Sequence, residues 1–174
     1  MDYMFETEHL KIRMFKREDS HDLYVNHLEE EVKKWIPNES YADVKEAQEA
    51  IEFYNDCVNK QRLPYVLAVE LKETGQLIGD TGVNEVEGRV NEAEIGYTIC
   101  EKCNGKGYAT ELVNAMTKFI VSAFGMHIMW GRVMHGNIAS VRVLEKNGYM
   151  FVKEEFGAED DPYGNGMLVY KKEF

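Results

Sequence analysis

The sequence predicts a mixed α/β fold, in which one sheet is covered by helices on both faces. Residues 9–14 alternate between apolar and polar side chains, as a strand with one buried face does. Residues 65–71 are apolar on both faces, which is typical of a central strand. Residues 112–123 carry apolar side chains at helical spacing. The predicted element order is β-α-α-β-β-β-loop-α-β-α-β-β.

The N-terminal part is predicted to be a strand followed by two helices. The strand is residues 9–14, and Asp19 or Ser20 is expected to cap the first helix. A loop begins at residues 35–38, and a second helix with one apolar stripe begins at about Asp43.

Three consecutive strands are predicted next. Pro64 ends the helical region, and the strands are residues 65–71, 77–83 and 92–100. The turn at residues 72–76 contains a glycine that can adopt positive φ, so the first two strands are expected to form a hairpin.

The C-terminal part is predicted to alternate helices and strands. The helix over residues 112–123 ends at Gly125, a suitable C-cap, and residues 128–134 form the next strand. A short helix runs from Asn137 to Gly148, and the last strands are residues 149–156 and 167–171. The total is about seven strands and about four helices. We see no linker or internal repeat, and the length suits a single domain over residues 1–174.

Composition and charge narrow the classes of function. The net charge of −11 argues against general nucleic-acid binding, because phosphate backbones are bound by basic surfaces. It permits a cationic acceptor such as an amine or a basic peptide. The N-terminal residues lack a basic flank and an apolar run, and no stretch is long enough to span a bilayer. A cytoplasmic protein without a membrane partner is expected.

The cysteines give no clear sign of a metal or redox centre. Cys100 and Cys103 form a C-x-x-C pair, a pattern found in redox sites and in half of a zinc site. No second C-x-x-C or suitably spaced histidine pair completes a zinc site, so no metal is expected. The role of the pair is left open.

The most informative stretch is residues 104–111, Asn-Gly-Lys-Gly-Tyr-Ala-Thr-Glu, which joins a predicted strand to a predicted helix. The first turn of a helix leaves backbone N–H groups unpaired at the positive end of the helix dipole, where a phosphate binds well. The glycines let an anion approach the backbone, and Lys106 adds positive charge. A Walker A motif fails at Cys100 and Gly107, and a dinucleotide fingerprint fails at Thr110. We therefore expect a different pyrophosphate-bearing cofactor.

Residues 104–109 resemble the acetyl-CoA loop of the GNAT superfamily of N-acetyltransferases, with Asn104 at the usual Gln or Arg position. The surrounding sequence is similar to the RimJ/RimL-like branch. It includes Ala-Glu-Ile-Gly-Tyr at 93–97, Gly-Tyr-Ala-Thr-Glu at 107–111, and the Asn, Ser and Leu-Glu-Lys-Asn-Gly-Tyr pattern within 137–149. The resemblance covers nearly the whole chain. It implies the GNAT fold, with a central mixed, mostly antiparallel sheet.

The resemblance also implies acetyl-CoA as co-substrate and direct transfer of its acetyl group to a primary amine. The backbone of residues 97–99 would meet the pantetheine and the thioester, and Asn137 would bond to the pantetheine arm. Arg142 or Lys146 would meet the CoA phosphates. The expected cofactor-binding residues are Tyr97, Thr98, Ile99, Asn104, Gly105, Lys106, Gly107, Tyr108, Ala109, Thr110, Asn137, Arg142 and Lys146.

Three residues are predicted to be catalytic. Glu94 is the first candidate for the base that deprotonates the acceptor, through water, and Glu155 on the strand expected beside it is the second. Many superfamily members carry a tyrosine that protonates the leaving thiolate where this chain has Leu144. The branch resemblance instead suggests Ser140 near the sulfur. His135 is an outside candidate for a base.

Each assignment has a simpler alternative. An outward strand carboxylate such as Glu94 is often only solvated, and Ser140 can cap its helix. Arg142 and Lys146 can form a solvated helix face.

The acceptor is left open between a peptide N-terminal α-amine and a small-molecule amine. Residues 35–43 and 157–165 are the expected acceptor-side segments, and Glu159, Asp160 and Asp161 can attract a cation. The alternative function is a non-catalytic module that binds or senses acyl-CoA, although the retained serine and carboxylates favour an enzyme. Exposed sheet edges make a homodimer plausible.

Overall fold

The computed structural model describes residues 3–157 and 166–174. At its centre is one eight-stranded sheet with the order β1-β2-β3-β4-β5-β6-β8-β7. The parallel pair is β5 with β6, and the other neighbours are antiparallel. The strands are β1 (Phe5–Glu6), β2 (Leu10–Arg13), β3 (Tyr65–Leu71), β4 (Gln76–Glu85), β5 (Glu92–Ile99), β6 (Ile128–Met134), β7 (Met150–Glu155) and β8 (Met167–Glu173).

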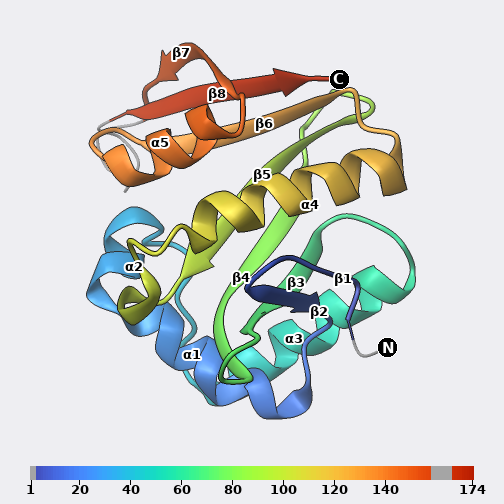
Figure 1. The fold of residues 1–174 in the computed structure, drawn as a ribbon, viewed down its shortest axis with the longest axis vertical. Helices are drawn as coiled ribbons and strands as arrows, with labels where there is room; N and C mark the ends of the chain where they lie inside the picture. The colour runs from blue at the N-terminus through green and yellow to red at the C-terminus, as the bar shows by residue number, and fades with distance from the viewer. Residues whose placement is uncertain (1–2, 158–165) are drawn as a thin grey trace.

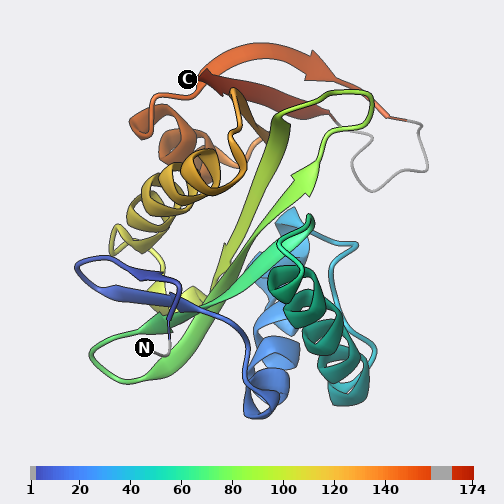
Figure 2. The same ribbon diagram turned by 90° about the vertical axis from the view of Figure 1, so that its right-hand side faces the viewer.

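Helices cover both faces of the sheet, as the sequence predicts (Figure 1, Figure 2). One face carries the first three helices and the other carries α4 and α5. Their bounds are α1 (Ser20–Leu28), α2 (Glu30–Trp35), α3 (Val44–Asn59), α4 (Tyr108–Phe124) and α5 (Ile138–Lys146). The mixed α/β fold and the predicted element order are confirmed. The structure adds the two-residue β1, the short α2 and two 3-10 turns, at Arg17–Asp19 and Glu101–Cys103.

The helices on each face pack against the sheet through separate clusters of buried apolar side chains. On one face, α4 buries Leu112, Met116 and Ile120 completely. On the other, α1 and α3 bury a smaller cluster that includes Leu23 and Ile51. Each fully buried side chain of this size contributes about 1.5–3 kcal/mol by leaving water. Within the described residues, no helix combines the length and the apolar character needed to cross a bilayer.

The helix ends agree only in part with the sequence-based expectation. Asp43 does begin α3, where its carboxylate accepts a hydrogen bond from the Glu46 N–H at 2.8 Å. Asp19 is the N-cap residue of α1, as expected, but its side chain makes no capping hydrogen bond, because the carboxylate accepts from the Arg13 guanidinium at 2.7 and 3.0 Å. Both residues are buried, so leaving the Arg13 charge without this partner would cost more than leaving the first helical turn without a side-chain cap.

The feature of the sheet that matters most for function is the separation of β5 from β6. These strands pair only at Glu92–Ile128, Ala93–Met129 and Glu94–Trp130. Beyond Glu94, β5 stays paired with β4 on its other edge as far as Ile99, and β6 stays paired with β8. Figure 1 shows the two strands diverging toward the start of α4. The facing backbone edges of residues 95–99 and 131–134 therefore border an opening in the sheet.

Candidate active site

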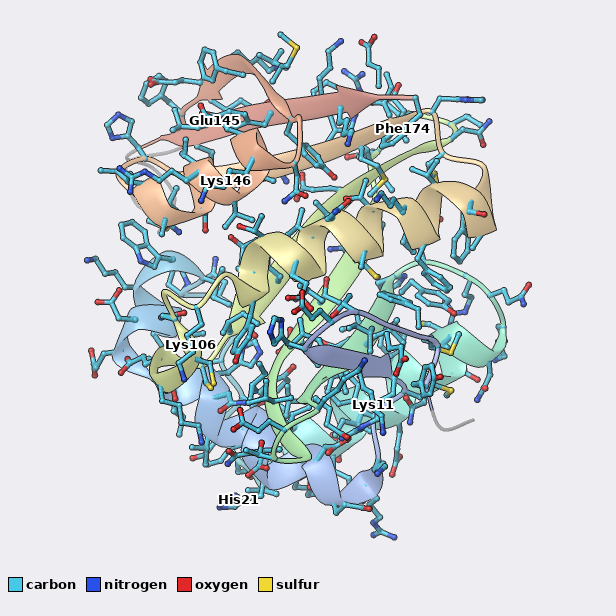
Figure 3. All side chains as sticks on the ribbon, in the orientation of Figure 1. Lys11, His21, Lys106, Glu145, Lys146 and Phe174 are labelled. Atoms are coloured by element: carbon cyan, nitrogen blue, oxygen red, sulfur yellow. The ribbon has the colours of Figure 1, made fainter. Side chains whose placement is uncertain are left out.

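A cavity of about 860 Å³ lies where β5 and β6 diverge, and its lining comes from both faces of the sheet. Alternation along β5 places Ile95 and Ile99 in the core beneath α4, so Glu94 and Thr98 face the opposite side. Every predicted cofactor-binding residue lines the cavity except Lys106, which is exposed on the loop before α4, and so do the catalytic candidates Glu94, Ser140 and Glu155. Figure 3 shows Lys106 and Lys146 on the side of the molecule where α4 begins.

The loop before α4 has the geometry of an anion site. Gly105 and Gly107 have φ of +74° and +85°, and Gly107 is the N-cap of the helix. The first helical hydrogen bond is donated by the Glu111 N–H to the Gly107 carbonyl at 3.1 Å, so the three preceding amides have no helical acceptor. A Cβ built on either glycine meets no atom within 4 Å. The space in front of the first turn is open to a ligand group.

Glu111, which the sequence analysis quoted only as part of a motif, fastens this helix start to the N-terminal hairpin. Its carboxylate accepts hydrogen bonds from the Thr7 hydroxyl and, at 2.8 Å, from the His9 backbone N–H. The His9 ring nitrogen Nδ1 lies 2.8 Å from the other carboxylate oxygen, and this contact raises the pKa of His9. No local pattern predicts a contact between residues so distant in the sequence.

Asn147 has a similar positioning role from the other side. Its side-chain amide donates to the Thr110 carbonyl at 3.2 Å and to the Val143 carbonyl at 2.8 Å, so the end of α5 is tied to the first turn of α4. Two residues later, the Tyr149 hydroxyl lies 2.7 Å from the Thr117 hydroxyl inside the core. These contacts give a structural reason for the Asn-Gly-Tyr part of the motif.

Two hydroxyls meet on the α4–α5 side of the opening. The hydroxyl oxygens of Tyr97 and Ser140 lie 3.0 Å apart. The alternative that Ser140 caps its helix is wrong, because Asn137 is the N-cap and its side-chain oxygen accepts from the Ser140 N–H at 3.3 Å. Burial raises the pKa of Tyr97 although the Ser140 hydrogen bond opposes this, so the phenol is protonated at neutral pH.

Carboxylates gather on the opposite side of the opening. Arg132 of β6 donates from Nε to Glu94 at 2.7 Å, and its Nη1 lies 3.5 Å from Glu155. The expectation that Glu155 sits on the strand beside Glu94 is wrong, because β6 and β8 separate β7 from β5. The long Arg132 side chain nevertheless brings the two carboxylates to one place. Lys153, together with Arg132, lowers the pKa of Glu155.

Glu39 is a site residue that the sequence analysis did not single out. It lies in the connection between α2 and α3, within the segment expected on the acceptor side, and it lines the cavity with Glu31. Its side chain is exposed toward the cavity, yet the surrounding protein raises its pKa by burial and by the charge of Asp80. Its position in an irregular segment left no periodic signal that could have identified it.

Two other predicted features, His135 and the acidic residues 159–161, are not part of the cavity that the structure describes. His135 is exposed, with its Nε2 3.9 Å from Glu154, and it does not line the cavity. The acidic residues Glu159, Asp160 and Asp161 lie outside the described residues.

The C-x-x-C cysteines are buried free thiols, and Cys103 contributes to the cavity wall. Burial and the neighbouring Cys103 raise the pKa of Cys100 to about 12, so its thiol is protonated at neutral pH. Among residues 3–157 and 166–174, no three His, Cys, Asp or Glu side chains are grouped as metal ligands.

Comparisons with known proteins agree with this geometry. The model of the acetyltransferase (GNAT) domain family matches residues 9–150. An uncharacterized N-acetyltransferase, p20, from Bacillus licheniformis is 28% identical over 148 residues, which cover 85% of this chain and 82% of the relative.

Two solved structures share the fold at 19% identity. A ribosomal-protein-S5-alanine acetyltransferase from Vibrio fischeri matches with a TM-score of 0.83, covering 97% of this chain and 95% of that one. A spermidine N-acetyltransferase from Vibrio cholerae, in complex with CoA and spermine, matches with a TM-score of 0.77, covering 96% of each chain.

Proposed function

Because the chain belongs to the acetyltransferase (GNAT) domain family, we propose that it transfers the acetyl group of acetyl-CoA directly to a primary amine. The observation that carries this proposal is that one continuous cavity runs through the opening between β5 and β6. It joins the glycine loop and the Tyr97–Ser140 hydroxyls on one face to the carboxylates on the other. Two substrates can therefore enter from opposite faces and meet at the opened strand.

The loop before α4 is proposed to hold the CoA pyrophosphate. The glycines leave room that a Cβ would fill, and the first-turn N–H groups supply donors at the positive end of the helix dipole. Arg142 and Lys146 of α5 line the same end of the cavity and supply positive charge. Because backbone donors do most of this work, Asn104 in place of the usual Gln or Arg is compatible with binding.

The open edge of β5 is proposed to hold the pantetheine arm and the thioester. A strand that has lost its neighbour presents backbone N–H and C=O groups to a ligand, and residues 95–99 line the cavity on the edge facing β6. An N–H group there can stabilise the negative charge that develops on the thioester oxygen during attack.

Protons are proposed to move on both sides of the reacting carbon. The neutral acceptor nitrogen forms a bond to the acetyl carbon, the carbon–sulfur bond breaks, the nitrogen releases its second proton to solvent, and the thiolate receives a proton from Ser140. Tyr97, 3.0 Å from Ser140 and protonated, can pass a proton to Ser140 and recover one from solvent. The two hydroxyls can therefore deliver a proton to the thiolate, a role that Leu144 cannot fill because its side chain has no proton donor.

The acceptor is an ammonium ion at neutral pH, so a base must remove a proton before attack. Glu94 lies closest along β5 to the opening, but the guanidinium of Arg132 holds its carboxylate. Glu155 is a weaker candidate because its pKa is lowered. The pKa of Glu39 is raised, the direction that favours a general base, and we propose that Glu39 receives the proton while Glu94 and Arg132 shape the acceptor site.

The acceptor is proposed to be a small-molecule amine or the α-amine of a peptide, drawn in by the carboxylates Glu31, Glu39, Glu94 and Glu155. The deciding experiment measures thiol release from acetyl-CoA with spermidine, amino sugars and peptides of different N-terminal residues, and identifies products by mass spectrometry. An acetylated amine supports the proposal and identifies the acceptor class. Binding of acetyl-CoA without transfer to any amine would favour the sensing module, and absence of binding would refute the proposal.

A further inference from the structure

A buried histidine–carboxylate pair lies behind the acceptor side of the cavity. His27 of α1 is 2% exposed and Asp80 of β4 is 8% exposed, and Nε2 of the ring lies 2.7 Å from an Asp80 carboxylate oxygen. Burial alone lowers the pKa of His27, but Asp80 and the nearby Glu39 outweigh it, so the pKa is raised. The raised pKa favours the charged form of the ring beside the Asp80 carboxylate.

The pair connects two walls of the cavity that are far apart in sequence. On the sheet side, the Thr98 hydroxyl donates to the same Asp80 oxygen at 2.9 Å, and Thr98 lines the cavity. On the helix side, residues 39–41 fold over His27. The Ser40 hydroxyl donates to the His27 carbonyl at 3.3 Å, and the Tyr41 ring packs edge-on against the imidazole with centroids 5.2 Å apart.

Burying the His27–Asp80 pair costs stability, so the pair needs a structural or functional reason to be present. Two buried charges lose their hydration, and apolar side chains of similar size often replace such a pair without loss of stability. In addition, the His27 Nδ1 atom is buried and has no hydrogen bond of good geometry among the described residues, although the Glu39 backbone lies near enough to contribute to the raised pKa of the ring. An unpaired buried polar atom costs about 1–3 kcal/mol. A leucine at position 27 would fill the core, but it could not form a hydrogen bond with Asp80.

We propose that His27 is a positioning residue for the acceptor: paired with Asp80, it holds the segment that carries Glu39 at a fixed distance from the β5 residue Thr98. This inference rests on the proposed function, since it assigns His27 to the acceptor half of that site. The α4 loop and α5, which are proposed to hold the CoA phosphates, make none of these contacts. Thr98 meets the pair through its side-chain hydroxyl, while its backbone position is set by pairing with β4. His27 therefore affects acceptor recognition and leaves acetyl-CoA binding unchanged.

The test uses His27→Gln, which keeps a side-chain N–H donor but removes the charge, and Ser40→Ala, which removes the hydrogen bond between the segment and the His27 backbone carbonyl. His21→Gln is the matched control, because His21 is exposed on the same helix (Figure 3). Acceptor KM and kcat are measured with spermidine or an N-terminal alanine peptide, whichever the wild type acetylates. Acetyl-CoA Kd comes from calorimetry, and hydrogen exchange reports protection of residues 39–41.

For His27→Gln we expect acceptor KM to rise about tenfold, the equivalent of one lost polar contact, with acetyl-CoA Kd changed by less than about twofold. Residues 39–41 should exchange faster, and Ser40→Ala should shift KM in the same direction by a smaller factor. If His27→Gln does not fold, Ser40→Ala decides.

Unchanged acceptor KM in the folded variants would overturn the inference, as would a parallel rise in acetyl-CoA Kd, which would indicate a role in the fold as a whole. A wild-type protein that acetylates no amine would instead refute the proposed function.

Discussion

Replacing Gly107 with valine separates CoA binding from folding. Gly107 is the N-cap of α4, its φ is +85°, and a Cβ there meets no atom within 4 Å. The Cβ of a valine would therefore meet no protein atom, and the side chain would occupy the space in front of the first-turn N–H groups. Gly75, in the turn between β3 and β4, is a matched control. Its φ is +70°, its Cβ is equally free, and it does not line the cavity.

The two substitutions carry a similar conformational cost. A non-glycine residue in the left-handed region loses about 1–2 kcal/mol, which lowers Tm by about 2–8 °C in a chain of this size. Binding is affected differently. Hydrogen bonds to a charged group contribute about 1.5–3 kcal/mol each, so blocking two backbone donors at Gly107 should cost about 3–6 kcal/mol. This corresponds to an increase in acetyl-CoA Kd of at least about 100-fold.

The assay is isothermal titration calorimetry with acetyl-CoA on the wild type and both variants, with Tm measured without ligand. We expect both variants to lose similar Tm and only Gly107→Val to lose affinity. Near wild-type affinity in Gly107→Val would refute the assignment of the loop to the pyrophosphate. Equal loss of affinity in Gly75→Val would show that general destabilisation explains the effect.

Three further predictions concern catalysis and stability. Ser140→Ala should lower kcat by about 10- to 100-fold with acetyl-CoA Kd nearly unchanged, and an unaltered kcat would remove Ser140 from the proton route. Glu39→Gln should lower kcat/KM at pH 7 more than Glu94→Gln does, with a deficit that shrinks as rising pH deprotonates the acceptor; the reverse ranking would restore Glu94 as the base. The raised pKa of His27, surrounded by Asp80, Glu39, Thr98 and Tyr41, should stabilise the wild type relative to His27→Gln fully below pH 6.5, the ordinary pKa of histidine. That difference in the free energy of unfolding should fall as pH rises through the pKa of the folded state, and a difference independent of pH between 6 and 9 would contradict it.

Local sequence patterns were sufficient for the fold, the family and the enzyme class, all of which are confirmed. Alternation in residues 9–14, the apolar run at residues 65–71 and helical spacing after Gly107 are properties of single segments, so they can be recognised without knowing what the segments contact. The glycine loop is predictable for the same reason, since positive φ at Gly105 and Gly107 is a local requirement. The individual roles assigned to the site residues stay predictions.

Features that depend on the order of strands or on irregular backbone were not predictable. The alternation of β5 places Glu94 correctly, but nothing local indicates that β8 inserts between β6 and β7, which leaves two strands between Glu94 and Glu155. Glu94 and Glu155 are nevertheless brought together, because the Arg132 side chain is long enough to reach both carboxylates. Glu39 belongs to a connection without periodicity, and the contact of Glu111 with His9 joins residues about a hundred positions apart.

The opening between β5 and β6 also explains why the two halves of the site can vary separately. In the proposed function, the CoA half depends on α4 and α5, which pack on one face, and the acceptor half depends on the segment between α2 and α3 on the other. The halves share the β5 backbone from residue 95 to residue 99, whose position is fixed by pairing with β4 and not by either substrate. A change in the acceptor segment can therefore alter which amine enters while the thioester stays in place. On this argument, acceptor identity is encoded in the least regular part of the chain, where local sequence patterns carry the least information.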